Sequence, residues 1–443
     1  MFSNKDLRKL IIPLVIEQLL AVTIGMADTV MVSSCGEAAV SGISLVDSIN
    51  FLLITLFSSL ATGGAVIASQ YIGRGDHKSA SLAAKQLFYA SLALSVVLGV
   101  IAVFFRKPVL NMVFGSIEAD VMAHAQIYFL LSAISYPFLA VYNAGAALFR
   151  SMGDSRTTML ISILMNTINI VGNAILIYGF QMAAAGAATA SLVSRAVGAI
   201  IITVLLLNPR RIIFYDKLHK PEIHLSMLKS ILQIGVPNGL ENSIFQIGKI
   251  LVASIVSGFG TISITANAVA GNLASLQVIP GMALGMAMIT VVGQCIGAKD
   301  YEAVKKYTKK LMLITYGVVW AMTLLMLLFS KQILSFYSLS EETTTMTMEV
   351  FIVHGICAVI VWPLAFALPN ALRAANDVRF TMIVSLLSMW IFRIGFSYIL
   401  AIYFNMGILG TWIAMCIDWF CRGACFVIRF ARGKWKNISF IDN

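Results

Sequence analysis

An internal duplication divides the chain into two homologous halves. Residues 13–76 align with residues 237–300 at a constant offset of 224, without a gap. The pairs shared at this offset include Pro13 and Pro237, Glu17 and Glu241, Gln70 and Gln294, and Asp76 and Asp300. A second match, at an offset of 223, pairs Arg150-x3-Asp154-x-Arg156 with Arg373-x3-Asp377-x-Arg379. Two related halves in an apolar chain are typical of transporters whose site lies between or within the halves.

Apolar segments long enough to cross a bilayer recur along both halves. The sequence is 59% hydrophobic and 12% charged, whereas soluble domains carry roughly 25% charged residues. Because a helix of about 20 apolar residues spans the hydrocarbon core, we predict an all-α integral membrane protein. It has twelve transmembrane helices in two pseudo-symmetric six-helix lobes. The predicted spans are 10–33, 43–72, 84–105, 122–149, 158–180, 184–207, 229–257, 264–296, 308–329, 346–371, 380–404 and 408–430.

The distribution of basic residues predicts the orientation of these helices. Most of the 31 Lys and Arg residues lie at the amino terminus, in or beside the loops that follow even-numbered spans, and in the tail. The opposite loops carry Arg106, Lys107 and Lys331. This asymmetry follows the positive-inside rule, so we predict a multi-pass protein of the cell (plasma or inner) membrane with both termini in the cytoplasm. The net charge of +11 therefore indicates contact with the lipid bilayer and no nucleic-acid partner.

The same spans predict the domain organisation. Residues 1–207 form an amino lobe, 208–228 a cytoplasmic linker, and 229–443 a carboxyl lobe. Pro280 lies in the middle of the eighth predicted span, and Pro137, Pro363 and Pro369 interrupt the fourth and tenth. Each frees a backbone carbonyl at depth, which is tolerated where protein or a water-filled cavity receives it. These positions predict either packing kinks or bends beside a substrate cavity.

One ionisable residue and three neutral polar residues are predicted at a common depth in the amino lobe. Asp28 lies 18 residues past Leu10, hence ~27 Å along its helix. Asn169 and Asn173 share one face of the fifth helix, and Ser191 lies at a similar depth in the sixth. Because a charge at depth costs about 2.5–3.5 kcal/mol on insertion scales, we interpret these oxygens as a Na⁺ or proton site. The alternative is hydrogen bonding that holds helices together.

Glu17 and Glu241 are the equivalent acidic residues of the two halves, each four residues after its proline. They are candidates for a substrate or carboxyl-lobe proton or cation site. The alternative is a structural role near a helix end. Lys249 is too far around its helix to pair with Glu241, and Asp418 and Arg422 predict a buried i, i+4 ion pair.

The remaining paired motifs predict helix ends. Asp154 and Asp377, after the fourth and tenth helices, are expected to cap the helices that follow. Gly73-x2-Asp76 and Gly297-x2-Asp300 follow the second and eighth predicted helices. In each motif, the glycine is expected to end the helix and the aspartate to cap the next one. No GxxxxGK[ST], HExxH or GxSxG motif occurs in the sequence. We therefore predict neither an ATP-driven motor nor an enzyme on this chain.

Several segments are similar to the multidrug and toxic compound extrusion (MATE) family. The segments that carry the resemblance are 12–18, 26–29 and 70–76, Phe149-Arg150-Ser151-Met152-Gly153-Asp154, Ile177-Tyr178-Gly179, and Gly235-Val236-Pro237-Asn238-Gly239-Leu240-Glu241-Asn242. The resemblance implies a V-shaped pair of six-helix lobes that exports cationic or amphipathic compounds, driven by inward Na⁺ or H⁺. It also places the amino-lobe cation site on Asp28, Asn169, Asn173 and Ser191, and Glu241 resembles an acidic position that some members use in the carboxyl lobe.

This sequence departs from the family at two of these positions. Many members have an aspartate where this chain has Asn173 and a threonine where it has Ser191. Asp28 is then the single formal charge of the cluster, so two carboxylates cannot share a proton there. A lone carboxylate among neutral oxygens favours Na⁺, with Asp28, Asn169 and Asn173 as ligands.

Together these observations predict a Na⁺- or H⁺-coupled antiporter that exports cationic or amphipathic drugs and toxic organic compounds by alternating access. We expect no cofactor besides the coupling ion, and a monomer. The alternative within the wider superfamily is a flippase of a lipid-linked oligosaccharide or polysaccharide precursor. A membrane enzyme and a structural membrane protein are further alternatives. The enzyme would turn over substrate in detergent without an ion gradient, and the structural protein would transport nothing and would not respond to a gradient.

Overall fold

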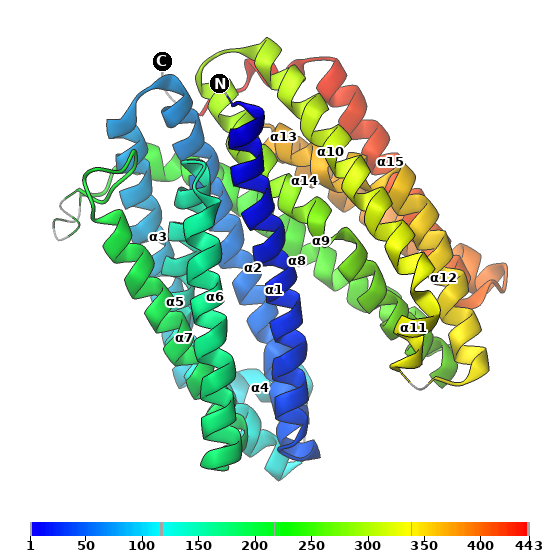
Figure 1. Cartoon of the computed structure of the whole chain (residues 1–443). Coiled ribbons are helices and arrows are strands. Elements are labelled where there is room, and N and C mark those ends of the chain that lie inside the picture. Colours follow the sequence, from blue (N-terminus) through cyan, green and yellow to red (C-terminus); the bar gives the residue numbers. More distant parts are fainter. Residues whose placement is uncertain are drawn as a thin grey trace. The chain divides into compact units, whose positions relative to one another are not determined.

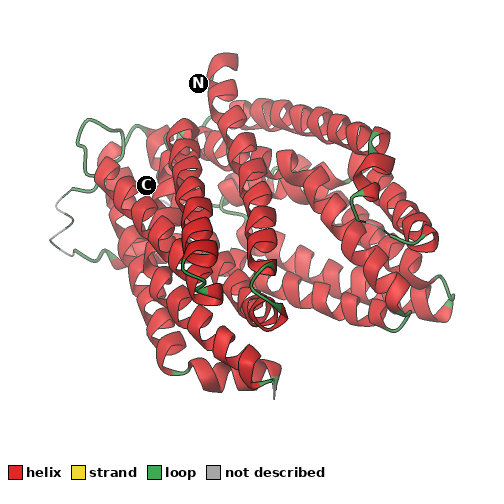
Figure 2. Cartoon of the chain, turned by 60° about the horizontal axis from the view of Figure 1, so that its bottom comes forward, coloured by secondary structure: helices red, strands yellow, loops and turns green. Residues whose placement is uncertain are grey.

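The protein folds as helices joined by short connections, and the part of the chain that the structure describes contains no strand (Figure 2). The computed structural model describes residues 2–115, 118–216, 218, 220, 222–337 and 339–440, without the side chains of 24, 26, 27 and 29. The predicted all-α fold class is confirmed.

The chain divides into two compact units, Met1–Gly239 and Leu240–Asn443 (Figure 1). The helices of the first unit are α1 (Asn4–Ser33), α2 (Glu37–Arg74), α3 (His77–Phe104), α4 (Arg106–Phe114), α5 (Ala119–Ser151), α6 (Ser155–Asn173), the π-helix η1 (Ala174–Gly179) and α7 (Ala183–Leu206). The change of unit falls inside α8 (Leu225–Ser257), after Gly239. The lobe limits 1–207, 208–228 and 229–443 stay a prediction.

The second unit repeats this order of helices with more interruptions. After α8 come α9 (Thr261–Gly297), α10 (Tyr301–Leu328), α11 (Ser330–Ser335), α12 (Glu341–Ile360), η2 (Pro363–Ala367), α13 (Leu368–Ala374), α14 (Val378–Ser388), η3 (Met389–Gly395), η4 (Tyr398–Tyr403), α15 (Gly407–Ala431) and the short η5 (Lys434–Asn437). The tenth predicted span is therefore broken at Pro363, whereas α5 and α9 continue through Pro137 and Pro280.

Each of the twelve predicted spans corresponds to a helical segment. Among the described residues, eleven helices are long and apolar enough to cross a membrane. The first predicted span is occupied by α1, which is 30 residues long. The short helices α4 and α11 were not predicted and lie in the connections after α3 and α10.

Close backbone approaches hold the helices of each unit together. A Cβ at Gly42 on α2 would lie 2.9 Å from the carbonyl oxygen of Val121 and the amide nitrogen of Ala125 on α5. In the second unit, a Cβ at Gly410 on α15 would lie 2.6 Å from the amide nitrogen of Ala401 on η4. Small residues at such crossings are typical of membrane helices, because lipid supplies no hydrophobic drive for their association.

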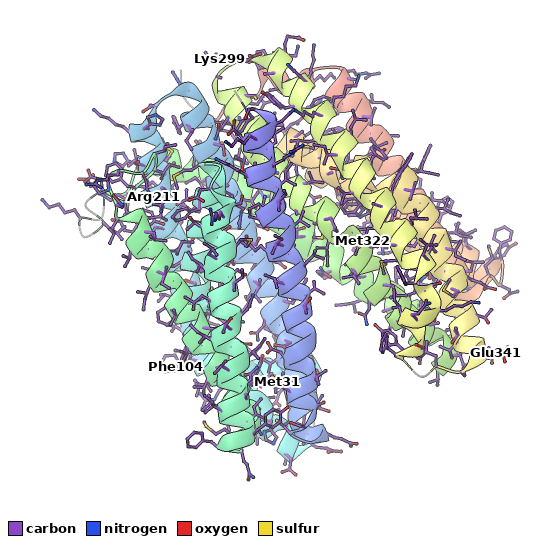
Figure 3. The ribbon with its side chains drawn as sticks, in the orientation of Figure 1. Met31, Phe104, Arg211, Lys299, Met322 and Glu341 are labelled. Carbon is purple, nitrogen blue, oxygen red and sulfur yellow. The ribbon has the colours of Figure 1, made fainter. Side chains whose placement is uncertain are left out.

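Labelled side chains mark the two ends of each unit. In the first unit, Met31 and Phe104 lie toward the lower end of the view and Arg211 toward the upper end (Figure 3). In the second unit, Lys299 lies at the upper end and Glu341 at the lower end (Figure 3). Within each unit, connections that follow even-numbered spans are therefore at the end opposite those that follow odd-numbered spans, as the prediction requires.

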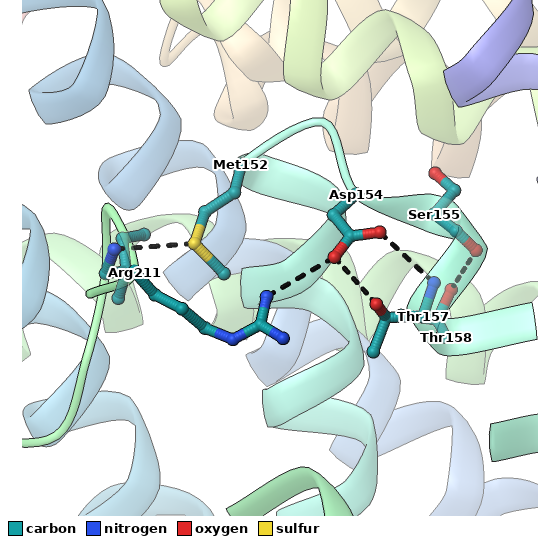
Figure 4. Close-up of polar contacts among 7 residues, drawn as sticks. Met152, Asp154, Ser155, Thr157, Thr158 and Arg211 are labelled. Carbon is teal, nitrogen blue, oxygen red and sulfur yellow. Dashed lines mark hydrogen bonds and ion pairs between the residues drawn. The ribbon is translucent and has the colours of Figure 1, made fainter. Parts of the chain in front are cut away.

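The segment after α7 is fixed to the first unit by specific contacts. Arg211 pairs with Asp154 at 3.4 Å, and the amide of Ile213 donates to the sulfur of Met152 (Figure 4). Tyr215 is buried against Phe88, with ring centroids 5.3 Å apart, and burial raises the pKa of its hydroxyl. The described part of this segment forms no domain of its own, so it acts as a connection held against the lobe.

The paired Gly-x2-Asp motifs end and begin helices, and α9 ends at Gly297 as predicted, but α2 does not end at Gly73. The α2 helix continues through Gly73 and ends at Arg74, because Gly75 takes the left-handed conformation (φ 79°) that a side chain disfavours. Beyond the end of α9 at Gly297, the residue with positive φ is Lys299 and not a glycine. The aspartates do cap the following helices: Asp76 accepts from the amide of Ser79 at 3.0 Å, and Asp300 from that of Ala303 at 2.9 Å.

We expect Asp76→Ala to lower the free energy of unfolding by about 1 kcal/mol, because α3 loses its cap. The hydrogen bonds from Ser79 hold the pKa of Asp76 below its usual range. The cap therefore contributes fully above the unfolded-state pKa of about 3.9 and is lost as pH falls through the lower folded-state value. Thermal unfolding of both proteins, recorded from pH 7 downward, should show the two melting curves converging only in acid. A constant difference across that range would contradict this account.

Candidate functional site

Three helices of the first unit bring the predicted cation-site residues together. Asp28 lies near the end of α1, Asn169 and Asn173 lie on the last turns of α6, and Ser191 lies on α7. The asparagine side chains are 7% and 1% exposed. The π-helix η1 begins directly after Asn173, so the regular α-helix ends at the residue that contacts Asp28.

Amide groups surround the carboxylate of Asp28. Asn173 Nδ2 donates to Asp28 Oδ1 at 2.7 Å. In the orientation that satisfies its neighbours, Asn169 Nδ2 donates to both carboxylate oxygens of Asp28, at 2.8 and 3.0 Å. The oxygen of the same amide then accepts from Ser191 Oγ at 3.1 Å. The four residues predicted at a common depth are therefore linked to one another by hydrogen bonds.

One oxygen of this cluster has no hydrogen-bond donor. Asn173 Oδ1 is buried and has no partner among the described residues, although a buried acceptor ordinarily has one. Carboxylate and amide oxygens are the ligands that hard cations prefer. Rotating an amide by half a turn exchanges its N–H for its oxygen, so Asp28, Asn169 and Asn173 can supply oxygens to a cation and Ser191 a further hydroxyl. The residues present therefore fit a small monovalent cation, and equally a proton on Asp28.

The two equivalent glutamates each pair with the arginine of the duplicated Arg-x3-Asp motif. Glu17 Oε1 lies 3.6 Å from Arg150 Nη1, and Glu17 Oε2 accepts from Thr158 Oγ1 at 2.8 Å. In the second unit, Glu241 Oε1 lies 2.7 Å from Arg373 Nη2. The same ion pair therefore occurs in both halves. Its glutamates belong to the segments that align at an offset of 224, and its arginines to those that align at an offset of 223. This supports the structural alternative for both glutamates, since each joins the first helix of its half to the end of the fourth.

The two aspartates of that motif differ in their contacts. Asp154 caps α6 as predicted, because it accepts from the amide of Thr157 at 3.2 Å. Asp377 makes no side-chain cap on α14. Its carboxylate instead receives two hydrogen bonds from Arg429, at 2.7 and 3.1 Å. The predicted cap at Asp377 is therefore wrong, because a bidentate arginine is the stronger partner.

Sequence comparison assigns this architecture to a family. The profile described as MatE matches residues 13–175 and 237–399, one match in each half. The chain belongs to the MatE family. The predicted resemblance is confirmed, and the chain is a multi-pass membrane transporter rather than an enzyme.

Relatives of known sequence span nearly the whole chain. An uncharacterized transporter, YisQ, from Bacillus subtilis is 26% identical over 96% of this chain and 93% of its own length. A probable multidrug resistance protein, NorM, from Thermotoga maritima is 26% identical over 98% of this chain and 93% of its own length. A crystal structure of MATE in the straight conformation superposes with a TM-score of 0.90, at 20% identity, over 98% of this chain and 97% of that one. This MatE chain therefore has the twelve-helix MATE fold.

A second carboxylate near Asp28 escaped the sequence analysis of this MatE chain. Asp47, on α2, accepts from the hydroxyl of Tyr128 at 3.0 Å and from Asn50 Nδ2 at 3.3 Å. Asp47 and Arg195 both lie within electrostatic range of Asp28. Asp47 is the fifth residue of the predicted span 43–72, so the sequence placed it near the membrane surface, where a charged side chain is common. An ionisable residue within a span was nevertheless a signal that could have been used.

Proposed function

We propose that this MatE transporter is a Na⁺- or H⁺-coupled antiporter that exports cationic or amphipathic organic compounds by alternating access. The observation that carries the proposal is the Asp28 cluster, in which a carboxylate faces two amides and one buried amide oxygen has no donor. Such a set of neutral oxygens around one charge is suited to Na⁺. The protein acts as a monomer in the cell membrane, with both termini in the cytoplasm and no cofactor besides the coupling ion.

The coupling ion acts through the hydrogen bonds of this cluster. With no ion bound, the amides of Asn169 and Asn173 donate to Asp28 and hold α1 against α6. A bound cation or proton removes the need for these donors, because it neutralises the carboxylate they stabilise. An ion can drive transport only if it binds the two access states with different affinity. In the amino lobe, the amides of Asn169 and Asn173 would donate to Asp28 in one state and bind the ion through their oxygens in the other. This change would give the two states different affinities for the ion.

Gradient-driven efflux from liposomes tests the proposal. The purified protein is reconstituted with ethidium inside, and an inward Na⁺ gradient and an inward proton gradient are applied separately. We expect efflux with one gradient and none with Asp28→Asn. Efflux that ignores both gradients would contradict ion coupling, and transfer of a lipid-linked oligosaccharide under the same conditions would favour the flippase alternative.

We expect Glu241→Gln to leave ion binding at Asp28 unchanged. The substitution removes the charge that pairs with Arg373 but keeps a hydrogen-bond acceptor, so it should lower the free energy of unfolding by about 1–3 kcal/mol. Na⁺ binding and melting temperature are measured on the same preparation, with Glu17→Gln as the matched variant. If Glu241→Gln lowered both Na⁺ binding and the melting temperature, the two lobes would form one coupled network, and separate roles for Glu241 and the Asp28 cluster would be contradicted.

A further inference from the structure

Three cations lie around the ring of Phe245 inside the carboxyl lobe, and two of them also contact one buried carboxylate. Lys249 lies on α8, Arg393 on η3, and Asp418 and Arg422 on α15. The predicted ion pair between Asp418 and Arg422 is confirmed at 3.0 Å, and Arg393 lies 4.0 Å from the same carboxylate. None of these residues contributes to the cluster around Asp28.

The cluster carries more positive than negative charge. The carboxylate of Asp418 is fully buried and already accepts from Ser388 in addition to the arginines. Within the described residues, Lys249 has no acidic group within ion-pair distance, and Arg393 lies close enough to repel it. Three cations and one anion leave an excess of two positive charges. Unpaired charge of this kind within a membrane span ordinarily marks a site.

Aromatic rings lie directly beside the cations. The centroid of the Phe245 ring is 5.3 Å from Lys249 Nζ and 5.4 Å from the guanidinium carbons of both Arg393 and Arg422. Arg422 also stacks over Phe366 at 4.5 Å. Cation–π contacts contribute about 0.5–2 kcal/mol each, and they leave the excess charge in place. The rings therefore add an apolar wall to a positively charged group of side chains.

Two buried donors of the cluster have no acceptor. Arg393 Nε and Arg422 Nε are buried and have no hydrogen-bond partner among the described residues, and Arg422 is only 3% exposed. Lys249, in contrast, is exposed. Lys249 is thus the accessible cation of the cluster, and the unsatisfied guanidinium donors of Arg393 and Arg422 are buried. An anion that entered beside Lys249 would meet both charge and donors, which are the features that recognise carboxylates and phosphates.

We propose that this cluster binds the acidic group of an amphipathic ligand, a carboxylate, sulfonate or phosphate, whose ring or chain packs against Phe245. The inference rests on the proposed function and deepens it, because it selects acidic and zwitterionic amphiphiles among the exported compounds. Lys249 supplies the entry charge, and Arg393 and Arg422 supply the donors. Asp418 holds the two arginines in place.

The depth of the cluster favours a transported compound over a membrane lipid. Lys249 is eight residues before the end of α8 and Asp418 eleven residues after the start of α15, hence ~12 and ~17 Å from those helix ends. A phospholipid headgroup remains at the bilayer surface, where the charged groups of lipids lie. We therefore assign the site to an organic acid that enters the lobe.

A matched pair of fluorescent probes tests the assignment. Dansylglycine is an anion and dansylcadaverine a cation with the same ring system. Binding of each is measured by fluorescence with the full-length protein in phosphatidylcholine nanodiscs, for wild type, Lys249→Met and Lys229→Met. Lys229 is an exposed lysine of the same helix and serves as the control. We expect wild type to bind dansylglycine, Lys249→Met to bind it about tenfold more weakly, and Lys229→Met to match wild type.

The outcomes separate this inference from the proposed function. Equal affinity for the two probes, or dansylglycine binding unaffected by Lys249→Met, would overturn the inference and leave ion-driven efflux untouched. Asp28→Asn should still bind dansylglycine even though it has lost ion-driven transport. Nanodiscs that contain phosphatidylglycerol provide the lipid arm. Loss of dansylglycine binding when phosphatidylglycerol is present would place a lipid headgroup in the cluster and overturn the substrate assignment.

Discussion

Replacing Asp28 with asparagine will abolish ion-driven efflux while the protein still folds. Asparagine has the shape of aspartate and keeps an oxygen that can accept from the amide of Asn173, so this contact of α1 with α6 remains. What is lost is the formal charge that attracts the coupling ion. Removing one charge from a buried polar site costs about 2–5 kcal/mol, and 3 kcal/mol corresponds to roughly 100-fold weaker binding. We expect Na⁺ or proton coupling to be weakened at least to that extent.

The matched control for this substitution is Asp120→Asn. Asp120 lies in the first turn of α5, in the same lobe, and is exposed. It should transport as wild type does, because it lies outside the Asp28 cluster. Efflux rates are compared at equal amounts of reconstituted protein, with size-exclusion profiles as the measure of folding. Wild-type efflux by the Asp28 variant would refute the assignment of the ion site.

Replacing Asp418 with asparagine will destabilise the carboxyl lobe by about 3–5 kcal/mol, because it leaves buried arginines without their counter-charge. Asp418 is 0% exposed, and it contacts Arg422 at 3.0 Å and Arg393 at 4.0 Å. Its lobe already carries excess positive charge, so the remaining repulsion increases further. The melting temperature in detergent should fall by many degrees.

Two further variants test the electrostatic origin of this loss. Glu302→Gln breaks an exposed pair with Lys305 and should change stability by no more than about 0.5 kcal/mol. Adding Arg422→Met to Asp418→Asn removes one of the unpaired cations and should recover part of the lost melting temperature. Equal melting temperatures for the single and double variants would show that charge is not the cause.

The depth of polar residues along straight helices could be predicted from the sequence. Asp28, Asn169 and Asn173 were grouped because each helix rises by a constant amount per residue. The structure places polar atoms of both asparagines of α6 within 3.0 Å of the carboxylate of Asp28 on α1. The duplication likewise identified Glu17 and Glu241 as equivalent. These inferences depend on the regular geometry of single helices, which the bilayer enforces.

Partners contributed by distant helices could not be predicted in the same way. The pairing of Glu241 with Arg373, and of Asp377 with Arg429, depends on how helix ends pack. The excess charge around Asp418 depends on three elements that no local pattern relates. The π-helical segments η1 to η4 were also not predicted, because an i→i+5 turn leaves no characteristic pattern in one sequence.

Counter-transport of the ion by substrate tests the central claim most directly. Proteoliposomes loaded with ethidium, with equal Na⁺ and pH on both sides, are diluted into ethidium-free buffer containing ²²Na⁺, and in parallel into buffer monitored with a pH dye. Since coupling is reciprocal, outward ethidium should draw one of these ions inward through wild type, and through Asp120→Asn, but not through Asp28→Asn. Ethidium efflux without movement of either ion, or the same ion uptake through Asp28→Asn, would contradict the account.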